Sequence, residues 1–274
     1  MKKVILSVAL VFLVTVAFAE NSIKKSISGA SFNSIEVASM FEIEVVKSSS
    51  CAVEVEIPER FEKYLVARVD GNTFELYLDN MPNKNKIKSE DVFKAVIYTP
   101  SLSEVELSGA VKAVFIGNFD ESEFEMDLSG AVNVTGLKVS SGRGSVDCSG
   151  ASKISDSELN IAHLELDCSG ASKVEFTIVS NVLNTEVSGA ANMLVKGAAE
   201  VVNIDASGAA KLNFAKFAVQ NADVECSGAA KLDMSVMKSL SVEASGASEL
   251  KYTAGEDLKI TGIDISGAAR VKSL

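Results

Sequence analysis

Serine and acidic residues recur at a fixed separation through most of this sequence, and both residue types could do chemistry. Nine copies of Ser-Gly-Ala lie between Ser108 and Ala268. An acidic residue stands two positions before each serine, namely Glu106, Asp127, Asp147, Asp167, Glu186, Asp205, Glu225, Glu243 and Asp264. A serine becomes a nucleophile when a base and an oxyanion hole assist it. Carboxylates can bind a hard cation such as Ca²⁺ or hydrolyse glycosides in pairs.

Neither serine nor carboxylate catalysis is favoured by the repeat itself. Nine equivalent serines share a single histidine, His163, so no triad can be assembled. The serines are expected at a turn, where their hydroxyls bond the backbone. No acidic pair differs from its copies, and a chain without Trp lacks the usual platform for stacking sugars. We therefore predict no catalytic residue, no cofactor and no enzymatic activity, with a carbohydrate-active or polysaccharide-binding protein as the alternative.

The acidic residues leave two interpretations open. They can form a solvated face that keeps the molecule soluble and discourages lateral sheet pairing. They can also form a row of Ca²⁺ sites. The repeat lacks the Gly-Asp nonapeptide pattern of dedicated calcium-binding rolls, which favours the solvated face, so no metal site is predicted.

The elements that must position these side chains are strands. Aligned on their serines, the repeats carry apolar residues at three and one positions before the serine and at five positions after it. These positions share one parity, and alternate residues of a strand point to opposite faces, so the three columns should face a core. Four positions after the serine, six of nine residues are basic, and Asn133, Asn192 and Glu249 are the exceptions.

The spacing of the repeats predicts how the strands are connected. Successive serines lie 18 to 21 residues apart, and a unit of that size cannot bury its apolar face alone. We predict an all-β right-handed parallel β-helix, or β-solenoid, with about 20 residues per rung and roughly nine regular rungs over residues 105–274. A sandwich of hairpins, the competing fold, would place turn signals every 8–12 residues.

The chain before the repeats divides into two predicted parts. Residues 1–19 have a basic start, a short apolar run and an Ala-x-Ala end, as a secretory signal peptide does. Residues 20–104 alternate like strands without a clear repeat and are predicted to form the first rungs and cap of the same solenoid. Within them, Asn80–Asp91 is polar and basic and is expected to be an exposed loop.

These features predict an exported protein that is periplasmic, associated with the outer surface or secreted. The first cysteine, Cys51, lies too far along the chain for a lipoprotein, and no later stretch is apolar enough to span a membrane. A net charge of −11 opposes nucleic-acid binding.

Three of the four cysteines, Cys148, Cys168 and Cys226, stand in an inward column and are interpreted as small apolar fillers. Cys148 and Cys168 belong to adjacent repeats and lie within the reach of a disulfide, which the sequence leaves open. No Cys-x-x-Cys pattern indicates zinc.

The nine repeats, with Phe32–Val37 and Tyr98–Leu102, resemble the auto-transporter adhesin "head GIN" domain family from about residue 25 onward. The resemblance implies an exported β-helical adhesin and supplies no catalytic or binding residues. We therefore expect a non-enzymatic envelope solenoid that presents a long regular surface to a protein or glycan partner.

A specific site would lie where the pattern breaks, at Asn133, Asn192, Glu249 or the 80–91 loop. A structural component that self-associates through its solenoid ends is a further alternative, because residues 263–274 carry no obvious polar cap.

Overall fold

The computed structural model describes residues 22–81 and 87–274, so the predicted signal peptide and the centre of the 80–91 loop lie outside the described residues. These described residues form twenty strands and one short 3-10 helix, η1 (Glu59–Tyr64). The strands are β1 (Ser22–Ser28), β2 (Ser34–Val37), β3 (Glu42–Lys47), β4 (Ala52–Pro58), β5 (Leu65–Asp70), β6 (Thr73–Leu78), β7 (Lys94–Thr99), β8 (Glu104–Leu107), β9 (Lys112–Ile116), β10 (Phe119–Leu128), β11 (Asn133–Thr135), β12 (Lys138–Cys148), β13 (Lys153–Cys168), β14 (Lys173–Val187), β15 (Asn192–Ala206), β16 (Lys211–Cys226), β17 (Lys231–Ala244), β18 (Glu249–Ala254), β19 (Lys259–Ile265) and β20 (Arg270–Ser273).

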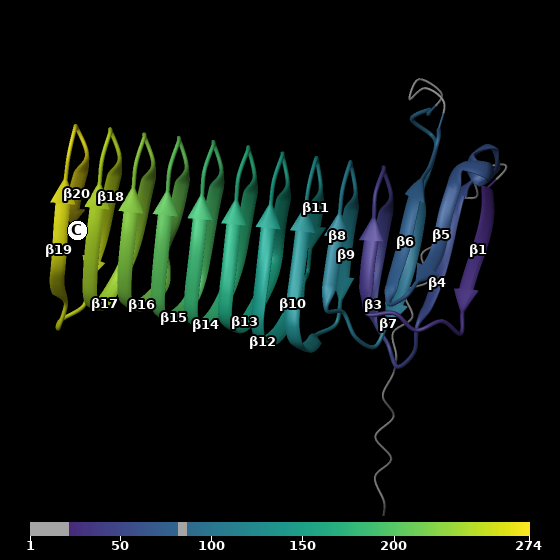
Figure 1. Ribbon diagram of the computed structural model, residues 1–274, viewed down its shortest axis with the longest axis horizontal. Helices are drawn as coiled ribbons and strands as arrows, with labels where there is room; N and C mark the ends of the chain where they lie inside the picture. The colour runs from purple at the N-terminus through teal and green to yellow at the C-terminus, as the bar shows by residue number, and fades with distance from the viewer. Residues whose placement is uncertain (1–21, 82–86) are drawn as a thin grey trace, which may run out of the picture.

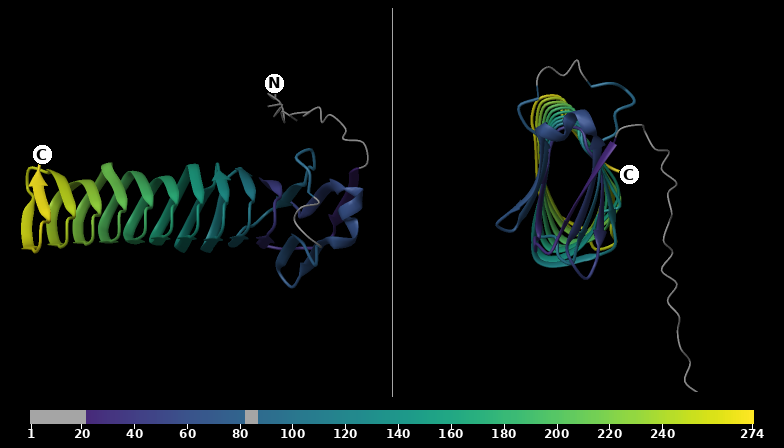
Figure 2. Two further views of the ribbon diagram at one scale, coloured as in Figure 1. Left: turned by 90° about the horizontal axis from the view of Figure 1, so that it is seen from above. Right: turned by 90° about the vertical axis from the view of Figure 1, so that its right-hand side faces the viewer.

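From β8 to β18 every strand pairs in parallel with a strand one turn further along the chain, and β19 and β20 form the last turn. Asp127 of β10 stands opposite Asp147 of β12, and Asp147 stands opposite Asp167 of β13. The rungs stack into a rod, seen from the side in Figure 1 and end-on in Figure 2. The predicted parallel β-solenoid with about 20 residues per rung is confirmed, with about eight turns, and the sandwich alternative is wrong.

Burial of the three apolar columns explains why the rungs stack. In the first eight repeats, every residue of these columns is at most 4% exposed. The last repeat differs, because Ile263 and Ile265 are 47% and 45% exposed. Apolar side chains leave water only where a rung lies on both sides of them, and the final rung has a neighbour on one side alone.

The Ser-Gly-Ala turns, the narrow loops after the arrowheads in Figure 1, stack as closely as the strands. From the second repeat onward, each alanine N–H donates to the carbonyl oxygen of the glycine one rung earlier, at 2.7–2.8 Å. The nine glycines have φ between +65° and +86°, a backbone conformation that L side chains disfavour. Glycine is therefore required for two reasons: the backbone has a positive φ, and each turn packs closely against the turn of the preceding rung.

The variable spacing of the repeats is absorbed at several places outside the Ser-Gly-Ala turn. Ile154 pairs with Val174, but Ser157 pairs with Phe176, so one extra residue is accommodated near Asp156. Asp156 accordingly adopts a φ of +52°. Bulges of this kind let a strand carry an added residue. The turn column stays in register while the repeat length changes.

The N-terminal part builds its rungs from non-consecutive strands. β2 and β3 stack directly on β8 and β9, and the chain inserts β4 to β7 between them. Ser39 occupies the place of the turn glycine with a φ of +80°, and its carbonyl oxygen accepts from Ala110 N at 2.7 Å. This rung carries no Ser-Gly-Ala motif, so the motif could not identify it. Conversely, the Ser-Gly-Ala at residues 28–30 does not lie in the column of stacked turns.

Antiparallel strands and aromatic side chains close the N-terminal end. β4 pairs antiparallel with β7 and β1, and β5 pairs antiparallel with β6. Beneath η1, the ring of Phe93 lies 5.1 Å from that of Phe61 and 5.9 Å from that of Phe41. Such edge-to-face clusters fill a large apolar volume. This end of the core is covered.

Candidate functional site

The predicted acidic residues form one continuous column along the solenoid. The pairing register places eleven carboxylates in line, which are Glu75, Glu36, Glu106, Asp127, Asp147, Asp167, Glu186, Asp205, Glu225, Glu243 and Asp264. We call this the acidic column. Sequence alignment on serine missed Glu36 and Glu75, because no Ser-Gly-Ala follows them. Each of these two glutamates stands between two apolar residues in the sequence, and a search for that apolar-acid-apolar pattern could have identified them.

Repulsion within the acidic column adds to partial burial in raising the pKa values of two of its members. Partial burial, followed by the charges of Glu36 and Asp127, raises the pKa of Glu106. Partial burial, followed by the charges of Asp167 and Asp127, raises the pKa of Asp147 to about 6. Within residues 22–81 and 87–274, the only ion pair to this column joins Glu75 to Arg68, at 2.8 Å. Each carboxylate therefore has mainly other carboxylates as charged neighbours.

A second column follows the turn and is largely basic. Its members are Lys94, Glu42, Lys112, Asn133, Lys153, Lys173, Asn192, Lys211, Lys231, Glu249 and Arg270. We call this the basic column. No more than two cations follow one another before a neutral or acidic residue intervenes. Lys112 pairs with Glu42 at 2.7 Å, and this hydrogen bond is the main reason that the pKa of Glu42 is lowered.

The interruptions at Asn133, Asn192 and Glu249 thus act as spacers between like charges. They were predicted as places for a specific site, and the register supplies a simpler reason for them. No such spacer interrupts the acidic column. In the described part of the chain, no ion pair joins the acidic column to the basic column, so the two do not neutralise each other.

The described part of the acidic column contains no preformed calcium site. Among residues 22–81 and 87–274, no group of three or more His, Cys, Asp or Glu side chains is arranged to hold a metal ion. Adjacent strands set the carboxylates about 4.8 Å apart in a straight row, whereas Ca²⁺ takes six to eight oxygen ligands around one point. A row of this kind attracts a diffuse layer of cations.

We predict that calcium stabilises the protein no more than magnesium does at equal ionic strength. Both should raise the melting temperature modestly, because screening weakens repulsion along the acidic column. Thermal unfolding in millimolar CaCl₂, in MgCl₂ and in NaCl of matched ionic strength measures this. A calcium-specific rise that a chelator reverses would show discrete calcium sites.

The serines and His163 do not form a catalytic arrangement. Ser149 Oγ donates to the carbonyl oxygen of Leu128 at 3.1 Å, which is the backbone bond expected at a corner. His163 is exposed and stands in register between Arg143 and Val182, on a different part of the rung from the turn. A serine nucleophile needs a base within hydrogen-bond reach, and His163 does not supply one.

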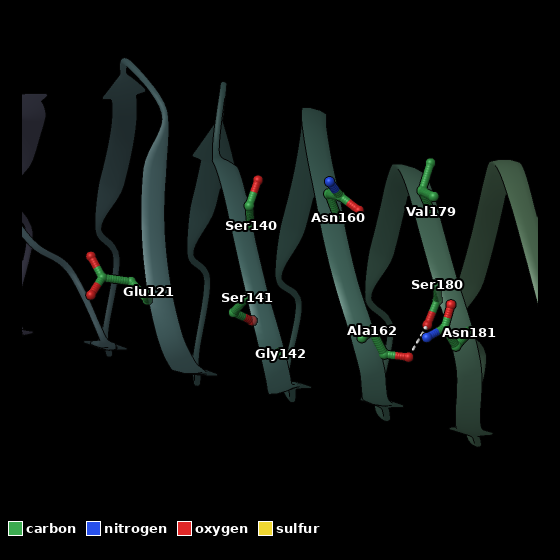
Figure 3. Close-up of a pocket in the computed structure, with 9 residues that line it drawn as sticks. All are labelled: Glu121, Ser140, Ser141, Gly142, Asn160, Ala162, Val179, Ser180 and Asn181. Carbon is green, nitrogen blue, oxygen red and sulfur yellow. Dashed lines mark hydrogen bonds between the residues drawn. The ribbon is translucent and has the colours of Figure 1, made fainter.

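The hollow drawn in Figure 3 lies where the rung bends away from the turn. It has a volume of about 380 Å³ and is lined by Glu121, Ser140, Ser141, Gly142, Asn160, Ala162, Val179, Ser180 and Asn181. The Glu121 carboxylate already accepts from Ser101 Oγ and Leu102 N, both at 2.7 Å. Ser180 Oγ lies 2.7 Å from the carbonyl oxygen of Val182. These polar groups serve the bend itself, so the hollow is a feature of the fold.

Of the predicted 80–91 loop, the described C-terminal part is attached to the N-terminal cap. The Asp91 carboxylate contacts the guanidinium of Arg60 in η1 and accepts from Lys88 N at 2.7 Å. This carboxylate is almost fully buried. A buried charge of this kind is stable only when paired, so Asp91 serves to hold the loop.

The three inward cysteines are buried free thiols, as fillers should be. Cys148 stands opposite Cys168 in register, and a hydrogen bond with Cys168, together with burial, raises the pKa of the Cys148 thiol. Burial raises the pKa of Cys226 to about 12. Since the thiolate is the reactive form, these side chains are poor nucleophiles and metal ligands.

Solved structures share this fold. A "putative adhesin" from Parabacteroides merdae ATCC 43184 has a TM-score of 0.67 and 14% identity, over 93% of this chain and 97% of that chain. A "putative lipid binding protein" from Parabacteroides distasonis ATCC 8503 has a TM-score of 0.64 and 18% identity at the same coverages. A "putative adhesin" from the same organism gives 0.61 and 15%, also over 93% and 97%. At these identities the likeness concerns the fold alone.

No curated protein matches the chain. No helix in the described residues is long and apolar enough to cross a membrane. The family model described as "Putative auto-transporter adhesin, head GIN domain" matches residues 31–157 and 144–255, which together make up well over half of the sequence. The expected resemblance is therefore confirmed, and the chain belongs to this family of auto-transporter adhesin head GIN domains.

Proposed function

We propose that this protein is an exported, non-enzymatic adhesin that binds a protein or glycan surface through the strand face carrying the acidic column. The proposal includes removal of residues 1–19 on export. The adhesin descriptions of the family and of solved structures with this fold support it. The flat, repeating outer surface offers many equivalent contacts, which suits a partner that is itself extended.

One observation points to the acidic face. Like charges in register cost stability, and the basic column is interrupted at Glu42, Asn133, Asn192 and Glu249 so that the repulsion stays small. The acidic column runs through eleven rungs without an interruption and retains carboxylates with raised pKa values. The basic column thus avoids electrostatic repulsion between neighbouring rungs, whereas the acidic column retains it. This difference supports a role for the acidic face in recognition. Its partner would carry positive charge.

The absence of a built pocket on the described surface supports a binding role over catalysis. The hollows along the rod are open, and Glu121 and Ser180 are engaged by neighbouring groups of the protein. Glycoside hydrolysis needs two carboxylates with distinct environments, one of them able to hold a proton. Asp147 has a raised pKa, but its neighbours Asp127 and Asp167 stand in the same row on the adjacent rungs, and the hollow beside Asp147 and Asp167 is open, so no enclosed site places two carboxylates around a sugar.

Two matched variants test which face binds. The acidic-face variant combines Asp167→Asn, Glu186→Gln and Asp205→Asn, and the basic-face control combines Lys153→Gln, Lys173→Gln and Lys211→Gln. Purified proteins are passed over immobilised cationic proteins, neutral glycans and anionic glycans at 0.15 M salt. We expect the wild type to bind a cationic surface and the acidic-face variant to bind at least about tenfold more weakly. The basic-face variant should bind like the wild type.

If the wild type and both variants bound equally well, or if both variants lost the same binding affinity, the acidic face would not be the binding surface. Release of product from any glycan in the panel would contradict the non-enzymatic part separately.

A further inference from the structure

The C-terminal rung presents apolar side chains that every other rung buries. Ile260, Ile263 and Ile265 of β19 are 43%, 47% and 45% exposed. The columns of Ile263 and Ile265 are at most 4% exposed in the first eight repeats, and Leu240, which stands opposite Ile260, is fully buried. The end of the rod is therefore a patch of core without a cover.

The backbone of this rung is open on the same side. β19 pairs with β17 and β20 pairs with β18, and neither has a partner on its outer edge among the described residues. Unpaired N–H and C=O groups on two such edges form a template for further strand pairing. Apolar side chains and free backbone groups thus point the same way along the rod.

The N-terminal end is a poorer partner for this patch. It is covered by antiparallel β1, β4 and β5 and by η1, as the right-hand side of Figure 1 shows. β1 and β5 each leave one edge unpaired among the described residues, but no large apolar side chain between residues 22 and 81 is exposed. Stacking of the C-terminal end of one copy on the N-terminal end of the next would therefore leave the exposed isoleucines without an apolar surface to cover them.

We propose that two copies of this chain pair through their C-terminal rungs about a two-fold axis, so that the two solenoids form one longer rod. The axis runs parallel to the strands. A rotation about it keeps each strand's direction and exchanges the two faces of the rung, which sets β19 of one copy beside β20 of the other. Because β19 and β20 run in opposite directions within one rung, the new pairs are antiparallel. The contact is closed, so the assembly stops at two copies.

Charge complementarity selects this arrangement. Both Ser-Gly-Ala turns at residues 266–268 lie at the same end of the interface, so Asp264, just before the turn, comes level with Arg270 of the other copy, just after it. The two-fold axis makes this pair twice. In the other two-fold arrangement β20 would lie antiparallel to β20 of the second copy, and in a register centred on Val271 the side chain of Arg270 would face Lys272. Like charges directly opposite one another on paired strands are destabilising.

The opposite end of the acidic column shows the same contact within one chain. There the column ends at Glu75, which stands opposite Arg68 on the antiparallel strand β5, with the two side chains 2.8 Å apart. The proposed dimer gives Asp264 an arginine on an antiparallel neighbour in the same way. At each end of the acidic column, the last carboxylate would then pair with an arginine guanidinium.

Light scattering over a concentration series tests the dimer, with the full exported chain. We expect a monomer–dimer equilibrium and no larger species. Asp264→Arg and Arg270→Asp should each raise the dimer dissociation constant at least about tenfold, and the double exchange should return it to within a few-fold of the wild type. The control Asp205→Arg alters the same column in mid-rod and should leave association unchanged.

A second pair of variants tests the apolar contact. Ile263→Asn should give a monomer, whereas Ile116→Asn on β9, where the side chain is also 47% exposed, should not alter the equilibrium. Melting temperatures of all variants identify any that lose the fold. A wild type that stays monomeric at every concentration, a series of species that grows without limit, or a double exchange that fails to restore pairing would each overturn the proposal.

Discussion

Gly170→Ala should destabilise the solenoid by about 3 kcal/mol or more, from a single methyl group on a solvent-exposed turn. A Cβ at this position would lie 2.5 Å from the carbonyl oxygen of Gly150, the atom that accepts the hydrogen bond from Ala171 N. The φ of +72° adds the usual cost of about 1–2 kcal/mol for a left-handed non-glycine residue. Forcing the rungs apart to relieve the overlap adds about 1–3 kcal/mol more. Urea unfolding followed by far-UV circular dichroism measures the change.

Two further glycines separate the causes. Gly29 also has a positive φ, +81°, but a Cβ there would meet nothing within 4 Å, so Gly29→Ala should cost about 1 kcal/mol. Gly142 lacks a positive φ and would place its Cβ 3.5 Å from Ser122 O, so Gly142→Ala should change the stability by less than about 0.5 kcal/mol. If all three variants lose the same stability, contact between stacked turns is not the reason for glycine.

Neutralising three adjacent carboxylates should stabilise the protein by about 2 kcal/mol at pH 7.5. The variant combines Asp127→Asn, Asp147→Asn and Asp167→Asn. Carboxylates about 4.8 Å apart repel by about 0.9 kcal/mol per pair at a water-like dielectric, and salt screening reduces the sum over the four pairs that are removed. Asparagines can also bond along the column, as Asn203 Nδ2 already does to Asn184 Oδ1 at 2.8 Å. Urea unfolding of variant and wild type measures the gain.

The gain should depend on pH in a defined direction. Asp147 has a folded pKa of about 6, above its ordinary value of 3.8, so the folded state binds more protons than the unfolded state between these values. The wild type therefore loses stability as the pH rises from about 4 to 7, and the variant loses less. The two curves should converge near pH 4.

The pair Lys153→Gln and Lys173→Gln serves as the control, because these lysines stack on the same rungs in the basic column. This control leaves the acidic column intact, so its stability should change with pH between 4 and 7 as that of the wild type does. An advantage of the asparagine variant that persists at pH 4 would show that packing, and not charge, produces it.

The fold class, the repeat and the alternation of buried and exposed columns could be predicted from the sequence. Strand periodicity is local: apolar Met126 and Leu128 on either side of Asp127 specify which way each side chain points, and copies at constant spacing must stack to bury the same face. The absence of a serine triad also followed from composition, because His163 is the only histidine. These conclusions needed no knowledge of long-range contacts.

Which distant segments share a column depends on long-range strand pairing and could not be predicted from the sequence. Ser39 stands in the glycine column, and Glu36 and Glu75 extend the acidic column, although β2 and β8 lie about 70 residues apart. The inserted strands β4 to β7 remove the fixed spacing on which the alignment depended, and antiparallel pairing reverses the direction of β5. The difference between a covered N-terminal end and an open C-terminal rung likewise arises from pairing across the chain. Local sequence specifies the shape of a rung, and the neighbours of that rung decide which side chains meet.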